Sequence, residues 1–220
     1  MKLSQKLTAE FIGTFTLIFA GVCSICANAG LVGIALAHGL ALAVMITSMG
    51  HVSGGHYNPA VTAGVLAGGK ISPSDAVAYI VAQLLGGVVG ALAAKSVFPE
   101  TVVQSAMLGT PMLGPGVTMA TGILMEFIMT FFLVTVVFGS AVDNRAPKLG
   151  GLLIGLTVTM DILAGGSISG ASMNPARTFG PALVGGYWDN HIVYWIGPVL
   201  GGVIAGLLYA KFTGKEGVTA

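Results

Sequence analysis

Charged side chains are scarce in this chain of 220 residues, and their scarcity excludes most classes of soluble protein. Only 8% of the residues are Asp, Glu, Lys or Arg, whereas a typical soluble domain has about a quarter. The formal net charge is +1 and no stretch concentrates basic residues, which excludes a nucleic-acid-binding surface. Hydrophobic residues make up 55% of the chain, and its mean hydropathy is +0.91. The composition therefore predicts a protein embedded in a lipid membrane.

Reactive side chains are also few. The two cysteines, Cys23 and Cys26, lie one helical turn apart in an apolar stretch. Without further Cys or His residues at ligand spacing they make neither a disulfide framework nor a metal site, and we expect them to be small packing residues. The chain also has no nucleophile paired with a base and no phosphate-binding loop. We therefore expect no enzymatic activity, no metal site and no cofactor.

Long apolar stretches are abundant. Six of them are each long enough to cross a hydrocarbon core of about 30 Å as a helix. They cover residues 11–29, 31–50, 75–98, 117–142, 149–168 and 191–212. The sequence thus predicts an all-α membrane protein.

An even number of spans places both termini on the same side of the membrane. Seven of the nine basic residues then lie on that side, namely Lys2, Lys6, Lys70, Arg145, Lys148, Lys211 and Lys215. Cytoplasmic loops are enriched in Lys and Arg. We therefore expect a multi-pass protein of the cell membrane with both termini in the cytoplasm.

The two halves of the chain resemble each other at a spacing of 116 residues. This shift aligns "AEFIGTFTLI" (9–18) with "MEFIMTFFLV" (125–134) and "SGGHYNPAVT" (53–62) with "SGASMNPART" (169–178). It also places Gly86 and Gly90 over Gly202 and Gly206. Each half has three spans, so the second half enters the membrane from the opposite face, which makes an inverted repeat. We expect one domain, 1–220, built from repeats at about 1–104 and 117–220 and joined by the loop at 108–116.

The tripeptide Asn-Pro-Ala occurs once in each half, at residues 58–60 and 174–176. A residue before proline is pushed out of the α region, and proline is favoured at the first helical position. Asn58 and Asn174 therefore read as N-caps, with Pro59, Ala60, Pro175 and Ala176 opening two helices. About ten residues follow before glycine or proline intervenes, which is half a membrane at 1.5 Å per residue. The stretches before them, "HVSGGHY" and "AGGSISGASM", are expected to be irregular and to line a wet cavity.

Two half-helices that meet at their N-termini would place partial positive charge and two carboxamides at the membrane midplane. Such a site offers hydrogen-bond donors to a neutral polar solute and repels cations. Held in this way, a central water would also interrupt a proton wire. The pattern favours a channel for neutral solutes that excludes ions.

With these motifs in place, the chain resembles the aquaporin, or major intrinsic protein, family over essentially its whole length. The resemblance rests on the twin "SGxxxNPA" motifs, on Glu10 and Glu126 near the start of their spans, and on "NPARTFGP" and "VYWIGP". It implies a right-handed bundle of six helices plus two half-helices, usually assembled as a homotetramer with one pore per subunit. It also implies that Glu10 and Glu126 accept hydrogen bonds from the loop before each motif. His56 stands beside the loop before the first motif, and we expect it to be structural.

Offsets from the motifs locate the four positions that form the selectivity filter in this family. They are His38, Ile162, Ala171 and Arg177. An always-charged Arg177 would block cations, whereas Ile162 and Ala171 would leave an apolar wall and His38 could donate or accept. This combination is similar to tonoplast intrinsic proteins, and the short ends and loops are typical of a prokaryotic relative. The resemblance implies conduction of water, with ammonia as a second permeant.

Three alternatives stay open. A glycerol or urea facilitator of the same family would be expected to have Asp at Thr178 and Pro at Tyr194. A secondary transporter shares inverted repeats and broken helices but needs ion ligands at the midplane. A purely structural membrane protein would need no Arg beside a midplane helix start.

The sequence does not account for Asp161, which stands beside Ile162.

Overall fold

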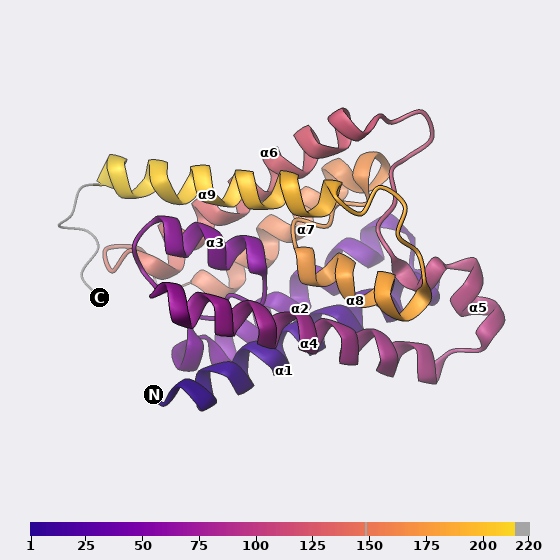
Figure 1. Ribbon diagram of the computed structural model, residues 1–220, viewed down its shortest axis with the longest axis horizontal. Coiled ribbons are helices and arrows are strands. Elements are labelled where there is room, and N and C mark those ends of the chain that lie inside the picture. Colours follow the sequence, from indigo (N-terminus) through magenta and orange to yellow (C-terminus); the bar gives the residue numbers. More distant parts are fainter. Residues whose placement is uncertain (148, 214–220) are drawn as a thin grey trace.

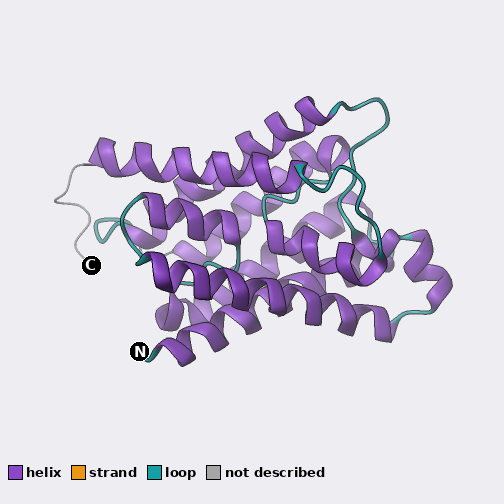
Figure 2. Ribbon diagram, viewed as in Figure 1, coloured by secondary structure: helices purple, strands orange, loops and turns teal. Residues whose placement is uncertain are grey.

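The computed structural model describes residues 1–147 and 149–213 and is all-helical over this range (Figures 1 and 2). Six of the described helices are long and apolar enough to cross a membrane. They are α1 (Leu3–Cys26), α2 (Gly30–Ser53), α4 (Pro73–Val97), α6 (Met119–Val137), α7 (Gly150–Ser169) and α9 (Val193–Thr213). The six predicted spans are therefore confirmed. Large apolar side chains such as Leu40 and Val77 stand exposed on the outer surface, as expected for residues that face lipid.

The helices extend beyond the predicted spans in a few places. Helix α1 begins at Leu3 rather than residue 11, because the apolar stretch marks only the part within hydrocarbon while the helix continues into the interface. After α6 the chain makes a π-helical turn, η2 (Phe138–Val142). A short helix, α5 (Glu100–Ser105), and a 3₁₀ turn, η1 (Met107–Gly109), were not predicted from the sequence.

The two half-helices are α3 (Pro59–Ala67) and α8 (Pro175–Gly185). Each begins at the proline of its Asn-Pro-Ala motif, and the preceding Asn is its N-cap. In Figure 1 the two lie roughly end to end between α4 and α9, with their N-terminal ends toward each other. Their combined length spans the bundle, as expected if each crosses half a membrane.

The irregular segments before the half-helices are shorter than predicted. Helix α2 runs through "HVS" to Ser53, and α7 runs through "AGGSIS" to Ser169. Only Gly54–Tyr57 and Gly170–Met173 are non-helical. Both α2 and α7 end with a left-handed glycine, which releases the chain without a steric penalty. The helical backbone satisfies its own hydrogen bonds up to that point, so only four residues per half need other partners.

Small residues allow the helices to cross closely. At the crossing of α2 and α7, a Cβ added to Gly39 would meet the carbonyl oxygen of Gly155, and a Cβ added to Gly155 would meet that of Gly39. Each half-helix also packs against the third span of the opposite half, through Gly64 on Gly202 and Gly180 on Gly87. These reciprocal contacts are those of an inverted repeat whose halves interlock.

The expectation that one register of 116 residues fits the whole chain is wrong for the third span of each half. Equivalent contacts there are 115 residues apart. Tyr79 donates to the Ser53 carbonyl and Tyr194 to the Ser169 carbonyl. Likewise Gly86 packs on the Phe11 carbonyl, and Gly201, not Gly202, packs on that of Phe127. The stretch from the Asn-Pro-Ala motif to this tyrosine is thus one residue shorter in the second half than in the first, a change that the glycine-rich sequence alone did not reveal.

Both ends of the described chain lie at the same end of the bundle, where Figure 1 shows the start of α1 and the end of α9 together. At the opposite end lie α5 and the connection that follows it. In the loop after η2, Arg145 donates to Asp143 at 2.6 Å, and this lowers the pKa of the Asp143 carboxyl below its usual range. An even number of spans is what brings the two ends together.

Candidate pore

The two irregular segments are held by one buried carboxylate each. Glu10 accepts from the Ser53 hydroxyl at 2.6 Å and from the backbone N–H groups of His56 and Tyr57 at 3.0 and 2.6 Å. The Gln83 amide adds a fourth donor at 2.8 Å. An ionised carboxylate can only accept, so the segment turns its N–H groups toward Glu10 and leaves carbonyls for the opposite side.

Glu126 has the same role in the second half. It accepts from the Ser169 hydroxyl at 2.7 Å and from the N–H groups of Ser172 and Met173 at 2.8 and 2.6 Å. The residue at the position of Gln83 is Pro198, 115 residues later, which offers no donor. Glu126 is as fully buried as Glu10 but has one donor fewer.

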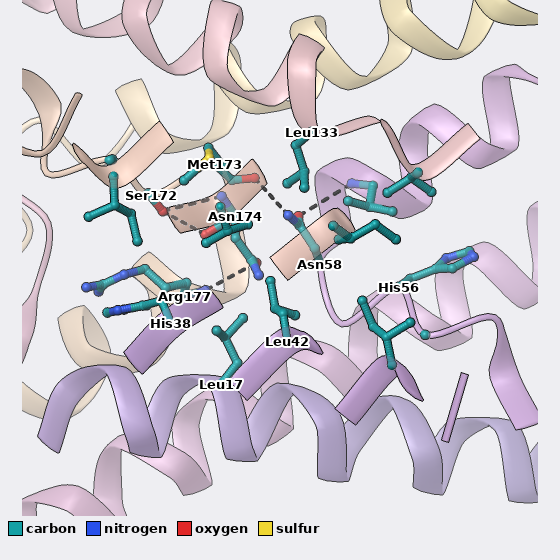
Figure 3. A pocket seen from close by; sticks show the side chains of 18 residues that line it. Leu17, His38, Leu42, His56, Asn58, Leu133, Ser172, Met173, Asn174 and Arg177 are labelled. Carbon is teal, nitrogen blue, oxygen red and sulfur yellow. Dashed lines mark hydrogen bonds between the residues drawn. The ribbon is translucent and has the colours of Figure 1, made fainter. Parts of the chain in front are cut away.

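The two Asn side chains are bound reciprocally, as Figure 3 shows. The Asn58 amide donates to the Met173 carbonyl at 2.8 Å, and the Asn174 amide donates to the Tyr57 carbonyl at 2.9 Å. Each amide oxygen meanwhile accepts from the first turn of its own half-helix. Because a carboxamide nitrogen carries two protons, each Asn keeps one N–H beyond these bonds. Both side chains line the central cavity, so this donor is available to a molecule inside it.

The prolines and alanines of both motifs are buried behind these amides. Ala60 and Ala176 are fully buried, and their N–H groups donate to Asn58 and Asn174 at 2.8 and 3.0 Å. They shape the helix starts but are not among the residues that line the cavity.

A narrow cavity runs past both Asn side chains, and only about 20 Å³ of it is open to the centres of water-sized molecules. Its lining follows the inverted repeat: sixteen of the eighteen lining residues form eight pairs whose members are 116 residues apart. The pairs are Leu17 and Leu133, His38 and Ile154, Leu42 and Val158, Ile46 and Ile162, Gly55 and Ala171, His56 and Ser172, Asn58 and Asn174, and Val61 and Arg177. The remaining two, Val137 and Met173, have the counterparts Gly21 and Tyr57, which do not line it. The cavity is therefore built twice from one plan, with polarity changed at a few positions.

The four positions predicted for a selectivity filter lie together at one end of this cavity. Both the cavity and a second hollow beyond it are lined by His38, Ile162, Ala171 and Arg177. We call this second hollow the loop-end vestibule; Gly109, Thr110 and Pro111 also line it. A residue shared by two adjoining spaces lies at the boundary between them. In Figure 3 the Arg177 and His38 side chains lie side by side at this end.

Arg177 is held in place by the chain opposite. Its guanidinium donates to the Gly109 carbonyl at 2.7 Å, and the residue is only 4% exposed. Met107, Leu108 and Gly109 all have positive φ angles, of 48°, 48° and 64°, which is the left-handed conformation that side chains other than glycine rarely adopt. The sequence pattern missed this partner, since a backbone carbonyl 68 residues away leaves no signal in residue types.

His38 has a fixed orientation as well. Its Nδ1 lies 2.8 Å from the Ile34 carbonyl oxygen, and since a carbonyl can only accept, Nδ1 carries a proton. In the neutral ring Nε2 is then an acceptor. Nε2 lies against Gly21 of α1, where an added Cβ would overlap the imidazole. The ring is thus enclosed between its own helix and α1.

The other end of the cavity is apolar. The repeat counterparts of the four predicted filter positions all line it, namely Val61, Ile154, Ile46 and Gly55. One polar residue, His56, lies at this end and also lines the vestibule on the side of the termini, together with Lys70 and Asp75. His56 therefore faces the cavity in addition to its backbone contact with Glu10, a position that the sequence interpretation of a structural histidine did not include.

A hydrogen-bond chain sets the tautomer of His56. The Thr62 hydroxyl donates its one proton to the Asn58 carbonyl at 3.0 Å, so it accepts from His56 Nδ1 at 3.1 Å and from Gln83 at 2.9 Å. Nδ1 of His56 is therefore protonated, and Nε2 is an acceptor in the neutral ring.

Asp161, which the sequence left unexplained, lies apart from the cavity. It is 2% exposed, and its Oδ2 has no hydrogen-bond partner among the described residues. It lines neither the central cavity nor the loop-end vestibule. Its repeat counterpart is the apolar Met45.

Comparison with known proteins gives consistent results. The family model described as "Major intrinsic protein" matches residues 1–209. Aquaporin TIP4-4 of Zea mays is 46% identical over 218 residues, which cover 93% of this chain and 85% of the relative. Aquaporin-8 of Rattus norvegicus is 43% identical over 217 residues, which cover 96% and 82%.

Among solved structures, the aquaglyceroporin from Plasmodium falciparum superposes with a TM-score of 0.83 at 23% identity. The match covers 97% of this chain and 96% of that one. At this identity the likeness concerns the fold alone.

Proposed function

Since the chain belongs to the major intrinsic protein family, we propose that it is a passive channel for water and other small neutral solutes that excludes protons and ions. The carrying observation is the pair of Asn amides. Each is fixed by the opposite loop at 2.8 or 2.9 Å and keeps one N–H for the cavity. Two donors at the centre of the passage, beside apolar side chains such as Leu17 and Leu133, bind the oxygen of a single solute and then release it.

Ion exclusion follows from the same arrangement. The N-termini of α3 and α8 direct partial positive charge at the centre, and Arg177 adds a full positive charge at the loop end. A cation that enters would lose its hydration shell and meet only positive potential. A water whose oxygen is held by the Asn amides directs its own protons outward, which interrupts proton transfer along a file of waters.

The choice of solute depends on the loop-end boundary. Ile162 and Ala171 supply an apolar wall there, and His38 has its Nδ1 proton committed to Ile34. We propose water as the main solute and ammonia as a second one, because a small neutral base can pass an apolar wall without the multiple hydrogen bonds that a polyol needs. The runner-up is a glycerol or urea facilitator.

Stopped-flow light scattering of proteoliposomes tests the channel. Vesicles with the protein should shrink at least about tenfold faster in hyperosmotic buffer than empty vesicles, with a low activation energy, while proton leak stays at the background level. Parallel assays with ammonia, urea and glycerol rank the solutes. Shrinkage no faster than in empty vesicles would refute the proposal, and saturable uptake coupled to an ion gradient would indicate a secondary transporter.

The variant His38→Phe separates water from ammonia. A phenyl ring at this position cannot accept a hydrogen bond and is larger than imidazole, so we expect ammonia flux to fall more than water flux. Unchanged ammonia flux in His38→Phe vesicles that still conduct water would show that His38 does not select for ammonia.

We further propose that the chain is one domain of two repeats, 1–220, that assembles as a homotetramer without a cofactor and has no enzymatic activity. Its place would be the cell membrane, with both termini in the cytoplasm. The basic residues at the terminus-side end of the bundle support this orientation. Native mass spectrometry in mild detergent tests the assembly, since a tetramer and a monomer differ fourfold in mass.

A further inference from the structure

Gly21 of α1 lies outside the cavity lining, yet it determines where a lining residue can stand. The His38 imidazole lies so close to Gly21 that a Cβ there would overlap Nε2, Cε1 and Cδ2 of the ring. The ring occupies the volume that a side chain at position 21 would fill. His38 is 3% exposed in consequence.

The second half of the chain fills the same space differently. The repeat counterparts of Gly21 and His38 are Val137 and Ile154, and both of these line the cavity. In the second half, the Val137 side chain faces the cavity, and Ile154 on the neighbouring helix is aliphatic. In the first half, Gly21 has no side chain, and the His38 imidazole occupies that space. The two positions therefore share one volume, which the halves divide in opposite ways.

Beside His38 at the loop-end boundary, Arg177 is anchored. Its guanidinium is bonded to the Gly109 carbonyl at 2.7 Å, and it is 4% exposed. If a side chain at position 21 displaced the imidazole, the ring would move toward the passage, because helix α1 is behind it and a ring is easier to shift than a helix backbone. The width of the passage at His38 therefore depends on the size of residue 21.

We infer that Gly21 is a specificity-determining position, which sets the bore at the loop-end boundary by letting the His38 ring withdraw against α1. The inference rests on the proposed channel function and deepens it. A residue of α1 that touches no solute acts here through His38, so its effect must disappear when the imidazole is absent.

A double-mutant cycle tests the coupling. In proteoliposomes, Gly21→Ala should lower water flux at least about tenfold, equivalent to about 1.4 kcal/mol in the barrier, and should lower the flux ratio of urea to water as well. In a His38→Ala background, Gly21→Ala should leave both flux and ratio at the His38→Ala level. An equal loss of flux in both backgrounds, or no loss in either, would overturn the inference.

Gly122→Ala is the matched control. Gly122 is a buried helical glycine whose added Cβ would meet Leu113, and Leu113 lines neither the cavity nor the loop-end vestibule. Its flux and selectivity should match those of the parent chain. If vesicles with the parent chain and vesicles with Gly21→Ala conduct water equally well, this inference alone is refuted. If vesicles with the parent chain do not conduct water, the channel function is refuted.

A second pair of variants covers the case in which Gly21→Ala does not assemble. The exchange Gly21→Val with His38→Ile copies the arrangement of Val137 and Ile154, so it should fold, conduct water and pass urea more readily than the parent. Gly21→Val alone should unfold at a lower temperature than this double variant. If the double variant is no more stable than the single one, positions 21 and 38 do not share one volume.

Discussion

Single residues decide how the two ends of the cavity differ. The halves supply equivalent positions, and most pairs match in character, such as Leu17 with Leu133 and Asn58 with Asn174. The polarity changes at Arg177, whose counterpart is Val61, and at His38, whose counterpart is Ile154. Because the repeat is inverted, these exchanges affect one end only. A symmetric scaffold thereby gains a charged end and an apolar end.

Asp161 has a buried oxygen, Oδ2, without a hydrogen-bond partner among the described residues. A buried carboxylate oxygen without a partner loses its hydration and gains nothing in return. Asp161→Met, which copies Met45 of the first half, should therefore raise the free energy of unfolding by about 1–3 kcal/mol. The unfolding midpoint of the detergent-solubilised protein measures this.

Water flux of the Asp161→Met variant should equal that of the parent chain, since Asp161 lines neither the cavity nor the loop-end vestibule. A less stable variant would indicate that Asp161 has a partner outside the described residues, such as a bound water. Asp161→Asn, which keeps the shape, serves as the control.

At the scale of elements, each half-helix is oriented by the segment that precedes it. The carboxylate of each half accepts from two backbone N–H groups of the irregular segment, those of His56 and Tyr57 in the first half and of Ser172 and Met173 in the second, which turns the carbonyls toward the opposite side. Both Asn amides then bond a carbonyl of the opposite segment. The half-helices are thus tied to each other at their N-termini, where their dipoles repel and where a fixed separation is needed.

The two carboxylates should differ in how much they stabilise their segments. Both oxygens of Glu10 accept two donors each, so Glu10→Gln must turn an NH₂ group toward two donors. Oε2 of Glu126 accepts only from Met173, so Glu126→Gln loses a single bond. We expect Glu10→Gln to be more destabilising than Glu126→Gln by about 1–3 kcal/mol.

Thermal unfolding of both variants, followed by tryptophan fluorescence, checks this order. Gln83→Leu is the control, because it should make the Glu10 site resemble that of Glu126. An equal cost for both Glu→Gln changes would show that the fourth donor of Glu10 has no net value.

On the scale of the whole molecule, the interlocked halves fix which parts share a side of the membrane. The start of α1 and the end of α9 lie at one end of the bundle, whereas α5 and its following loop lie at the other (Figure 1). Lys2 and Asp189 are both exposed and belong to opposite ends of this arrangement.

Single-cysteine labelling tests this topology. In a background without Cys23 and Cys26, Lys2→Cys should react with a membrane-impermeant maleimide only in lysed or inside-out vesicles, and Asp189→Cys only from the outside of intact cells. Labelling of both from the same side would contradict an arrangement with six spans. Labelling of each from the side opposite to the expected one would reverse the proposed orientation only.

Much of the fold could be predicted from the sequence because membranes impose strict lengths. The six spans were found since hydrocarbon requires about twenty apolar residues per helix, and the half-helix starts were found since Asn-Pro has few conformations. Boundaries were less accurate where helices continue into the interface, as at Leu3. The register of the third span was wrong by one residue, because glycines in series align equally well at neighbouring positions.

The sequence by itself determined the spans, the inverted repeat and the two facing helix starts, because these depend on local conformational preference, on periodic apolarity and on internal repetition. The four predicted filter positions rested on the family resemblance instead. Only the tertiary structure decided the rest. It placed the Gly109 carbonyl against Arg177 and the His38 ring against Gly21. It also made Gln83 a hydrogen-bond donor to Glu10, whereas Glu126 has no equivalent donor. These contacts join residues far apart in the chain and depend on backbone atoms or on the absence of a side chain, neither of which leaves a pattern in the order of residues.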